Sequence, residues 1–153
     1  MLAKMLAKIT ATTLLLLLSL AAVAAQGVVN VQSNHSVAAT ATRFESIATD
    51  KGLTVFNRID HGAGAAKVGM ALPPTQIILF GNPKVGTPLM QCQRTAAIDL
   101  PQKMLIWQDE AGKVWLSYND PQYLKARHKL QGCDEVVAKI TKVLSKLSKA
   151  AAN

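Results

Sequence analysis

The sequence predicts an α+β fold in which two long helices lie on one face of a mostly antiparallel sheet. Two segments, beginning at Val37 and at Asp134, have apolar residues at helical spacing. Between them lie short runs rich in strand-forming residues, separated by Gly, Pro, Asn and Asp. This order, a run of strands bracketed by two helices, indicates one α+β domain without internal repeats.

The first strand and helix are predicted over residues 27–33 and 37–50. The strand is rich in valine, and Ser36 stands where a helix N-cap is expected. The apolar positions that follow have helical spacing, and Gly52 stands where a C-terminal cap is needed.

A half-buried strand is predicted over residues 53–60. Its loose alternation places Leu53, Val55 and Ile59 on one face and Thr54, Arg58 and Asp60 mostly on the other. The small residues at 61–66 allow close approach of another backbone. We expect a turn of helix within residues 63–70, which ends before Pro73.

The segment over residues 80–88 has a composition that packing alone does not explain. An apolar strand over 75–80 leads into this loop, which holds two Gly and two Pro. Its side-chain donors are Asn82, Lys84 and Thr87. Thr87 and Pro88 form an N-cap and first-turn pair, so a helix over 88–94 would turn its positive end toward the loop. Such a loop can hold an anion; the alternative is a tight turn with a solvated lysine.

A hairpin and two helices are predicted for the C-terminal part of the chain. The expected elements are strands over 103–108 and 114–118, a helix over 121–129 and a last helix from Asp134. The apolar stripe of the last helix is Val136, Val137, Ile140, Val143, Leu144 and Leu147. The residues expected opposite it are Lys139, Lys142, Lys146 and Lys149. This lysine face is either a solvated surface or a contact for an anionic membrane or partner.

The first 25 residues have the organisation of a secretory signal peptide. Lys4 and Lys8 precede an apolar segment over 9–23, and small residues follow as far as Ala25. We expect cleavage near Ala25, which leaves a single domain over residues 26–153 in the periplasm or outside the cell. A membrane anchor is the alternative, but residues 10–25 are fewer than the roughly 20 that span a bilayer. We therefore expect no stable anchor after cleavage.

Charge and cysteine content narrow the range of partners. Removal of residues 1–25 takes away two lysines and no acid, which lowers the formal net charge from +8 to +6. An exported protein seldom meets nucleic acid, so this charge favours anionic lipid, polysaccharide or small anions, or simply solubility. Cys92 and Cys133 would meet an oxidising compartment, where pairing is the default. Their bond would close a loop of about 40 residues and contribute on the order of 3–4 kcal/mol, if the geometry allows it.

Several short motifs together match a known family. They are His61 after an Ile-Asp strand end, Phe80-Gly81-Asn82-Pro83-Lys84 with Thr87-Pro88, Asp99-Leu100-Pro101, Trp115 to Tyr118, and Arg127-His128. From about residue 28 to 147 the chain resembles the exported members of the domain of unknown function 302 family. The resemblance implies a TATA-binding-protein-like arrangement, with one helix after the first strand and one at the end, packed on a curved antiparallel sheet. It also implies a homodimer, but it implies no activity, and the two cysteines are not part of the family pattern.

Seven polar residues at predicted strand ends or in tight loops are candidate ligand-binding residues. They are His61, Asn82, Lys84, Thr87, Asp99, Tyr118 and His128. If several converge, they form a pocket with donors on one side and an acid on the other. We expect a non-enzymatic binding or accessory module for a small anion or metabolite, in which Lys84 supplies charge, the amides after Gly81 donate and His61 orients the ligand. Each residue also has a structural interpretation, such as Asp99 holding the loop before Pro101.

Three other functions are alternatives. An envelope interaction protein would dimerise or dock through a sheet edge or the lysine face. An enzyme would use His61 or His128 as a general base oriented by Asp99, but the sequence has no nucleophile elbow or phosphate-binding fingerprint. A copper or zinc protein would draw on His35, His61, His128, Met70, Met90 and the cysteines, which lack the spacing of a metal motif. We therefore expect no cofactor, no catalytic residue and no metal ligand.

Overall fold

The computed structural model describes residues 25–153, so the predicted signal peptide, apart from Ala25, lies outside the described residues. One open sheet of five strands runs in the order β1-β5-β4-β3-β2, and every neighbouring pair is antiparallel. The strands are β1 (Val28–Ser33), β2 (Thr54–Asp60), β3 (Thr75–Gly81), β4 (Gln102–Gln108) and β5 (Val114–Asn119). The predicted α+β class and antiparallel sheet are confirmed.

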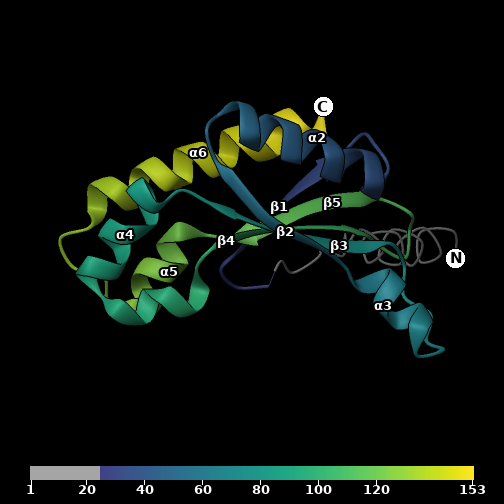
Figure 1. Cartoon of the computed structure of the whole chain (residues 1–153), viewed down its shortest axis with the longest axis horizontal. Coiled ribbons are helices and arrows are strands. Elements are labelled where there is room, and N and C mark those ends of the chain that lie inside the picture. The colour runs from purple at the N-terminus through teal and green to yellow at the C-terminus, as the bar shows by residue number, and fades with distance from the viewer. Residues whose placement is uncertain (1–24) are drawn as a thin grey trace, which may run out of the picture.

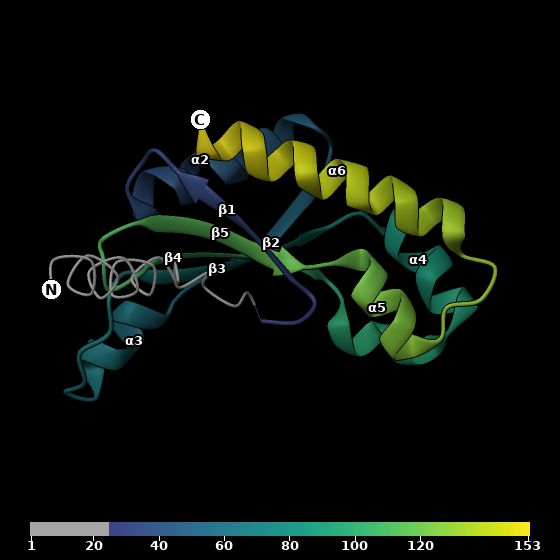
Figure 2. The same ribbon diagram turned by 180° about the vertical axis from the view of Figure 1, so that it is seen from behind.

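Two long helices cover one face of the curved sheet (Figure 1). They are α2 (Val37–Asp50) and α6 (Asp134–Ala152), which lie side by side in both views (Figure 2). The α2 helix begins where Ser36 accepts a hydrogen bond from the Ala39 amide, and it ends before Gly52, whose φ is +74°. Phe44 of α2 packs edge-on against Phe80 of β3, with ring centroids 4.9 Å apart. The helix periodicity therefore predicted both the helices and the faces that they bury.

The remaining helices lie at the two ends of the sheet (Figures 1 and 2). At one end α4 (Pro83–Cys92), the 3₁₀ helix η1 (Arg94–Asp99) and α5 (Pro121–His128) form a lobe beneath the start of α6. At the other end α3 (His61–Lys67) projects away from the body of the molecule. The lobe and α6 together enclose the site described below.

The predicted assignment of β2 residues to the two faces of the sheet is wrong. The register shifts between Val55 and Asn57, which is a β-bulge at Phe56. The extra residue reverses the alternation, so Arg58 shares the helix-covered face with Val55, and Ile59 turns to the uncovered face, where it is 40% exposed. A simple period of two cannot anticipate a bulge.

The predicted start of α4 is also wrong. The helix begins at Pro83, not at Pro88, and its N-cap is Asn82, whose side chain accepts from the Lys84 amide at 2.9 Å. The sequence offers two cap-proline pairs, and asparagine is the better cap of the two. Pro88 therefore lies inside the helix, and most of the expected loop is helical.

Candidate functional site

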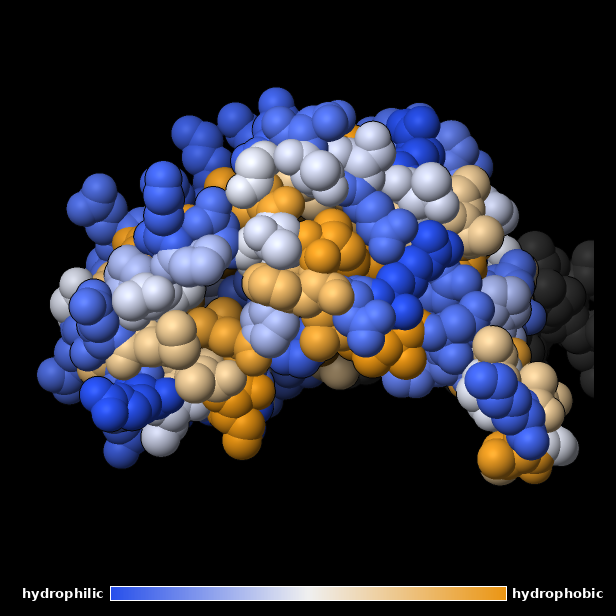
Figure 3. Space-filling view, in the orientation of Figure 1, coloured by the Kyte–Doolittle hydropathy of each residue, from blue (hydrophilic) through white to orange (hydrophobic). Residues whose placement is uncertain are grey.

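A cleft of about 840 Å³ lies between α6, the lobe and the adjoining end of the sheet. We call it the α4–α6 cleft. Hydrophobic surface gathers on this face of the molecule, between α4 and the start of β2 (Figure 3). Its apolar lining includes Phe56, Phe80, Leu89, Ile140, Val143 and Leu147. A largely apolar cavity of this size, with a few polar groups at its edge, is typical of small-ligand sites.

The polar part of the cleft is basic. The lining lysines are Lys51, Lys84, Lys139 and Lys146, and no acidic residue of the described chain lines the cleft. All four lysines are exposed, and long lysine side chains on apolar surface keep their ammonium groups in water. The cleft therefore combines an apolar interior with a positive rim.

Three of the seven predicted site residues, Asn82, Lys84 and Thr87, line this cleft. The amides that we expected to hold an anion are used within the chain. The Lys84 amide donates to the Asn82 side chain at 2.9 Å, and the amides of Val85 and Gly86 donate to the Asn82 carbonyl, each at 2.9 Å. An anion at this end of α4 would therefore be bound by side chains, among which Lys84 supplies the positive charge.

Asp99 and His128 are paired outside the α4–α6 cleft. Asp99 Oδ2 lies 2.5 Å from His128 Nε2, and the Arg127 guanidinium donates to the other carboxylate oxygen at 3.3 Å. Thr95 Oγ1 lies 3.2 Å from the remaining ring nitrogen of His128. These contacts join η1 to α5, and Leu100, which follows η1, lines the cleft. The pair therefore positions one wall of the cleft from behind.

Tyr118 and His61 lie away from the cleft lining. Tyr118 is 7% exposed in β5, where burial raises the pKa of its hydroxyl and a hydrogen bond with Ser148 offsets part of that rise. His61 is the exposed first residue of α3, at the opposite end of the sheet. The seven candidates thus form one group of three, one pair and two separate residues.

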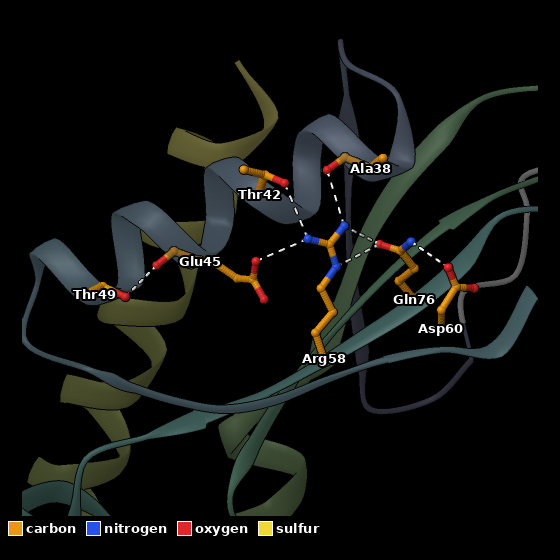
Figure 4. Close-up of polar contacts among 7 residues, drawn as sticks. All are labelled: Ala38, Thr42, Glu45, Thr49, Arg58, Asp60 and Gln76. Carbon is orange, nitrogen blue, oxygen red and sulfur yellow. Dashed lines mark hydrogen bonds and ion pairs between the residues drawn. The ribbon is translucent and has the colours of Figure 1, made fainter. Parts of the chain in front are cut away.

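A second polar cluster surrounds Arg58 at the edge of the sheet (Figure 4). Its guanidinium donates to the Gln76 side chain twice, at 2.7 and 3.0 Å, and to the Glu45 carboxylate at 3.1 Å. The Thr42 hydroxyl and the Ala38 carbonyl, both on α2, accept the two remaining bonds at 3.3 and 3.4 Å. Because all five guanidinium donors have partners within the chain, this cluster ties β2 to α2 and is not an open site.

The same cluster extends to the start of α3. Gln76 donates to one carboxylate oxygen of Asp60 at 2.9 Å, and the Ala63 amide donates to the other at 2.8 Å. The amide of Ala63 and then the Gln76 side chain hold the pKa of Asp60 below its usual value. Asp60 is therefore the ionised N-cap of α3.

Cys92 and Cys133 form a disulfide, with Cα atoms 6.5 Å apart. The bond joins the end of α4 to the start of α6, the two helices that face each other across the cleft. Both cysteines are thereby unavailable as thiolate ligands. Within residues 25–153 no three His, Cys, Asp or Glu side chains gather as a metal site would require.

Sequence reasoning missed several cleft residues. Lys51 follows α2, and Gln102 opens β4 with a buried Nε2 that has no hydrogen-bond partner among the described residues. Neither position has a local pattern that indicates a ligand site. Lys139 and Lys146 did have a signal, because residues seven apart on a helix share one side. The sequence places them on one predicted lysine face with Lys142 and Lys149, which do not line the cleft.

Curated relatives of this chain include two fluoride channels. It is 49% identical over 120 residues to "Fluoride-specific ion channel FluC 1" of Brucella suis biovar 1 (strain 1330), a match that covers 78% of this chain and 47% of that protein. The protein of the same name from Brucella abortus biovar 1 (strain 9-941) has the same identity, with 44% of its length covered. The chain thus spans less than half the length of these relatives. Between residues 25 and 153, no helix has the length and apolar character needed to cross a bilayer.

A solved structure matches the fold of this chain, and a family model matches most of its sequence. The crystal structure of uncharacterized conserved protein DUF302 from Bacillus stearothermophilus superimposes with a TM-score of 0.75 at 19% identity, over 83% of this chain and 99% of that one. At this identity the likeness concerns the fold. The model of the family described as "Domain of unknown function DUF302" matches residues 29–147, close to the range expected from the motifs. This chain therefore belongs to the DUF302 family.

Proposed function

We propose that this chain is a non-enzymatic binding module whose ligand, a small metabolite or anion with an apolar part, occupies the α4–α6 cleft. The observation that carries the proposal is the mainly apolar cavity of about 840 Å³ with lysines at its mouth. Ligand sites commonly measure roughly 300–1,000 Å³ and combine apolar walls with a few polar groups. Lys84, predicted to supply the charge of such a site, is one of the lining lysines.

The position of the acid-base pair favours binding over catalysis. Asp99 and His128 would be the base and its orienting acid in an enzyme, but neither lines the cleft. Asp99 contacts α5 and Lys103 donates to its carbonyl oxygen, so its surroundings are those of a structural joint. A general base must reach a proton of the bound ligand, and this pair stands behind the wall.

Native mass spectrometry combined with titration of a fluorescent apolar probe tests the proposal. Val143→Trp places a large side chain at a lining position that is 37% exposed. Ala138→Trp is the matched control, because Ala138 is an exposed α6 residue that does not line the cleft. We expect Val143→Trp to lose the probe and any co-purified ligand, while the control keeps both. Equal binding by the two variants would place the ligand elsewhere.

We also infer that the mature protein is exported, with cleavage near Ala25. The Cys92–Cys133 disulfide supports this location, because such bonds persist mainly in oxidising compartments. The intact mass of the protein recovered from its native compartment tests the inference. A mass that begins near residue 26 is expected, and the mass of the full chain would contradict cleavage.

A homodimer is the arrangement that we propose for the mature protein. The sheet face opposite α2 and α6 carries Ile59, Ile77, Leu79, Leu105, Trp107 and Trp115, as the register assigns them. An antiparallel sheet with a solvated face normally presents polar side chains there. The same face also carries Asn30, Asn57, Lys103 and Ser117, but an apolar patch of this kind favours burial against a second copy.

A second candidate function is an accessory role beside a fluoride channel. It is favoured by the 49% identity over 120 residues to proteins named fluoride-specific ion channels, of which this chain matches less than half. A strain without this protein would then be more sensitive to fluoride, and a plasmid copy would restore resistance. Unchanged sensitivity would remove this candidate and leave the cleft-binding proposal intact.

A further inference from the structure

The α4–α6 cleft has the charge distribution of a site for an anionic amphiphile. Its floor is built from apolar side chains such as Phe80 and Leu144, which are 2% and 1% exposed. Its mouth carries four exposed lysines without an acidic neighbour among the lining residues. A bare inorganic anion would leave the apolar floor unused, and a neutral apolar molecule would leave the lysines unpaired. A ligand with one long apolar chain and one negative group satisfies both parts.

Two of the lysines mark one end of the cleft. Lys84 of α4 and Lys139 of α6 also border a smaller hollow beside the disulfide. Glu135 lines this smaller hollow as well, but it does not line the cleft. They come from helices that face each other and that the disulfide joins. Two lysines from two different helices thus border the same two hollows, and both ammonium groups can form charge-assisted hydrogen bonds with one carboxylate there.

The other lysines of α6 provide an internal comparison. Lys139 and Lys146 are seven residues apart, which places them on one side of the helix about 10 Å from each other. Lys142 and Lys149 have the same spacing but do not line the cleft. One helix therefore carries exposed lysines of equal charge both inside and outside the proposed site.

On the basis of the proposed binding function, we propose that the ligand is a long-chain monocarboxylate. Its single chain lies on the apolar floor of the cleft, and its carboxylate pairs with Lys84 and Lys139. The cavity volume, about 840 Å³, is in the range that holds one drug-sized molecule and suits one chain.

Displacement of a bound fluorescent apolar probe by a series of amphiphiles tests this assignment on the delipidated protein. Octanoate, decanoate and dodecanoate are compared below their micelle concentrations. Because each buried methylene strengthens binding, we expect affinity to rise about fourfold per methylene until the floor is filled. Dodecanol, which lacks the charge, should bind at least tenfold more weakly than dodecanoate, and so should dodecyltrimethylammonium, because of the lysines.

Paired lysine variants locate the carboxylate. Lys84→Ala combined with Lys139→Ala should weaken dodecanoate at least tenfold and leave dodecanol within about twofold. Lys142→Ala combined with Lys149→Ala removes the same charge and should change dodecanoate less than twofold. Equal losses in both double variants would assign the effect to overall surface charge and overturn the proposed pairing with Lys84 and Lys139.

The outcomes separate this proposal from the proposed function. If dodecanol binds as tightly as dodecanoate, the monocarboxylate assignment is wrong while the cleft remains a binding site. If neither amphiphiles nor the probe bind, and no ligand mass is retained, the proposed binding function itself fails.

Discussion

His128 Nε2 lies 2.5 Å from the Asp99 carboxylate, and this contact joins α5 to the end of η1. Both side chains are largely buried, with 6% and 12% of their surfaces exposed. Breaking a buried polar pair leaves one group without its partner, which costs more than the loss of a surface contact. The pair is therefore expected to hold the wall of the cleft in place.

Replacement of Asp99 tests this role. We expect Asp99→Ala to lower the free energy of unfolding by about 2 kcal/mol or more, measured by urea denaturation. Arg127→Ala is the matched control, because Arg127 contacts the same carboxylate at 3.3 Å but is 47% exposed. Its cost should stay below about 1 kcal/mol. An equal loss in the free energy of unfolding for both variants would show that the His128 contact contributes no more to stability than the exposed Arg127 contact.

The carboxylate of Asp109 provides a pH-dependent signal in the β4–β5 turn. It accepts from the Trp115 indole at 2.8 Å and from the Lys113 and Ala111 amides at 2.8 and 3.0 Å. The Trp115 bond first, and then the two amides, lower the pKa of Asp109 from 3.8. Since the folded pKa is lowered, this group stabilises the turn above pH 3.8, and the contribution is lost as the pH falls through the folded pKa.

Fluorescence of Trp115 measures that titration once Trp107 is replaced by Phe. We expect the emission to change with a midpoint below pH 3.8. Asp109→Asn in the same background should abolish the transition. A midpoint at or above 3.8 would mean that the carboxylate is not held in its ionised form.

The buried side chain of Gln102 is expected to lower the stability of the ligand-free protein. Its buried Nε2 has no partner among the described residues, and an unsatisfied buried donor costs roughly 1–3 kcal/mol. Gln102→Met keeps the length and removes the polar group, so thermal denaturation of the ligand-free protein should occur at a higher temperature. A lower denaturation temperature would reveal a partner for this amide.

Loss of the disulfide should affect both stability and the cleft. Cys92→Ser combined with Cys133→Ser opens a bond with a sequence separation of 41, and we expect a loss of roughly 2–4 kcal/mol by urea denaturation. Since the bond joins α4 to α6, apolar probe binding should also weaken. Reducing agent should reproduce both effects in the wild type and change nothing in the double variant. An unchanged stability would contradict the predicted contribution of the bond.

A single substitution that adds a charge to the uncovered sheet face tests self-association through that face. Leu105→Lys places an ammonium group on β4, the central strand of that face, and should convert a dimer to a monomer in light scattering. Ala138→Lys adds the same charge on α6, on the other side of the sheet, and should leave the dimer intact. A wild-type protein that is monomeric at all concentrations rules out the dimer.

Local patterns predicted most of the secondary structure. Ser36 and Gly52 delimit α2, and Asp120 and Pro121 begin α5. Of the predicted apolar stripe of α6, Val137, Ile140, Leu144 and Leu147 are buried, while Val136 is half-buried and Val143 is 37% exposed. Caps, turns and helix periodicity depend on residues within a few positions of each other, so the sequence alone carries them. The short motifs that predicted the family, from His61 to His128, lie within these elements and the turns that join them.

Local patterns failed where two solutions competed or where the sheet changed register. Asn82 and Thr87 each precede a proline, and the chain uses the first pair as the start of α4. The bulge at Phe56 turned Arg58 inward, where Glu45 and Gln76 on neighbouring elements satisfy its guanidinium. The bulge and the partners of Arg58 depend on elements elsewhere in the fold, whereas the choice between the two caps follows the better capping ability of asparagine.

The sequence by itself determined the fold class and the family. It also determined that the two cysteines could pair only with each other within the chain. Only the tertiary structure decided that Lys84 and Lys139 meet at one cleft, while Asp99 and His128 form a separate joint. The physical reason is that a cleft is the space left between packed elements. Its lining comes from side chains between Ile47 and Ala150, each of which follows an ordinary core or surface pattern in its own segment.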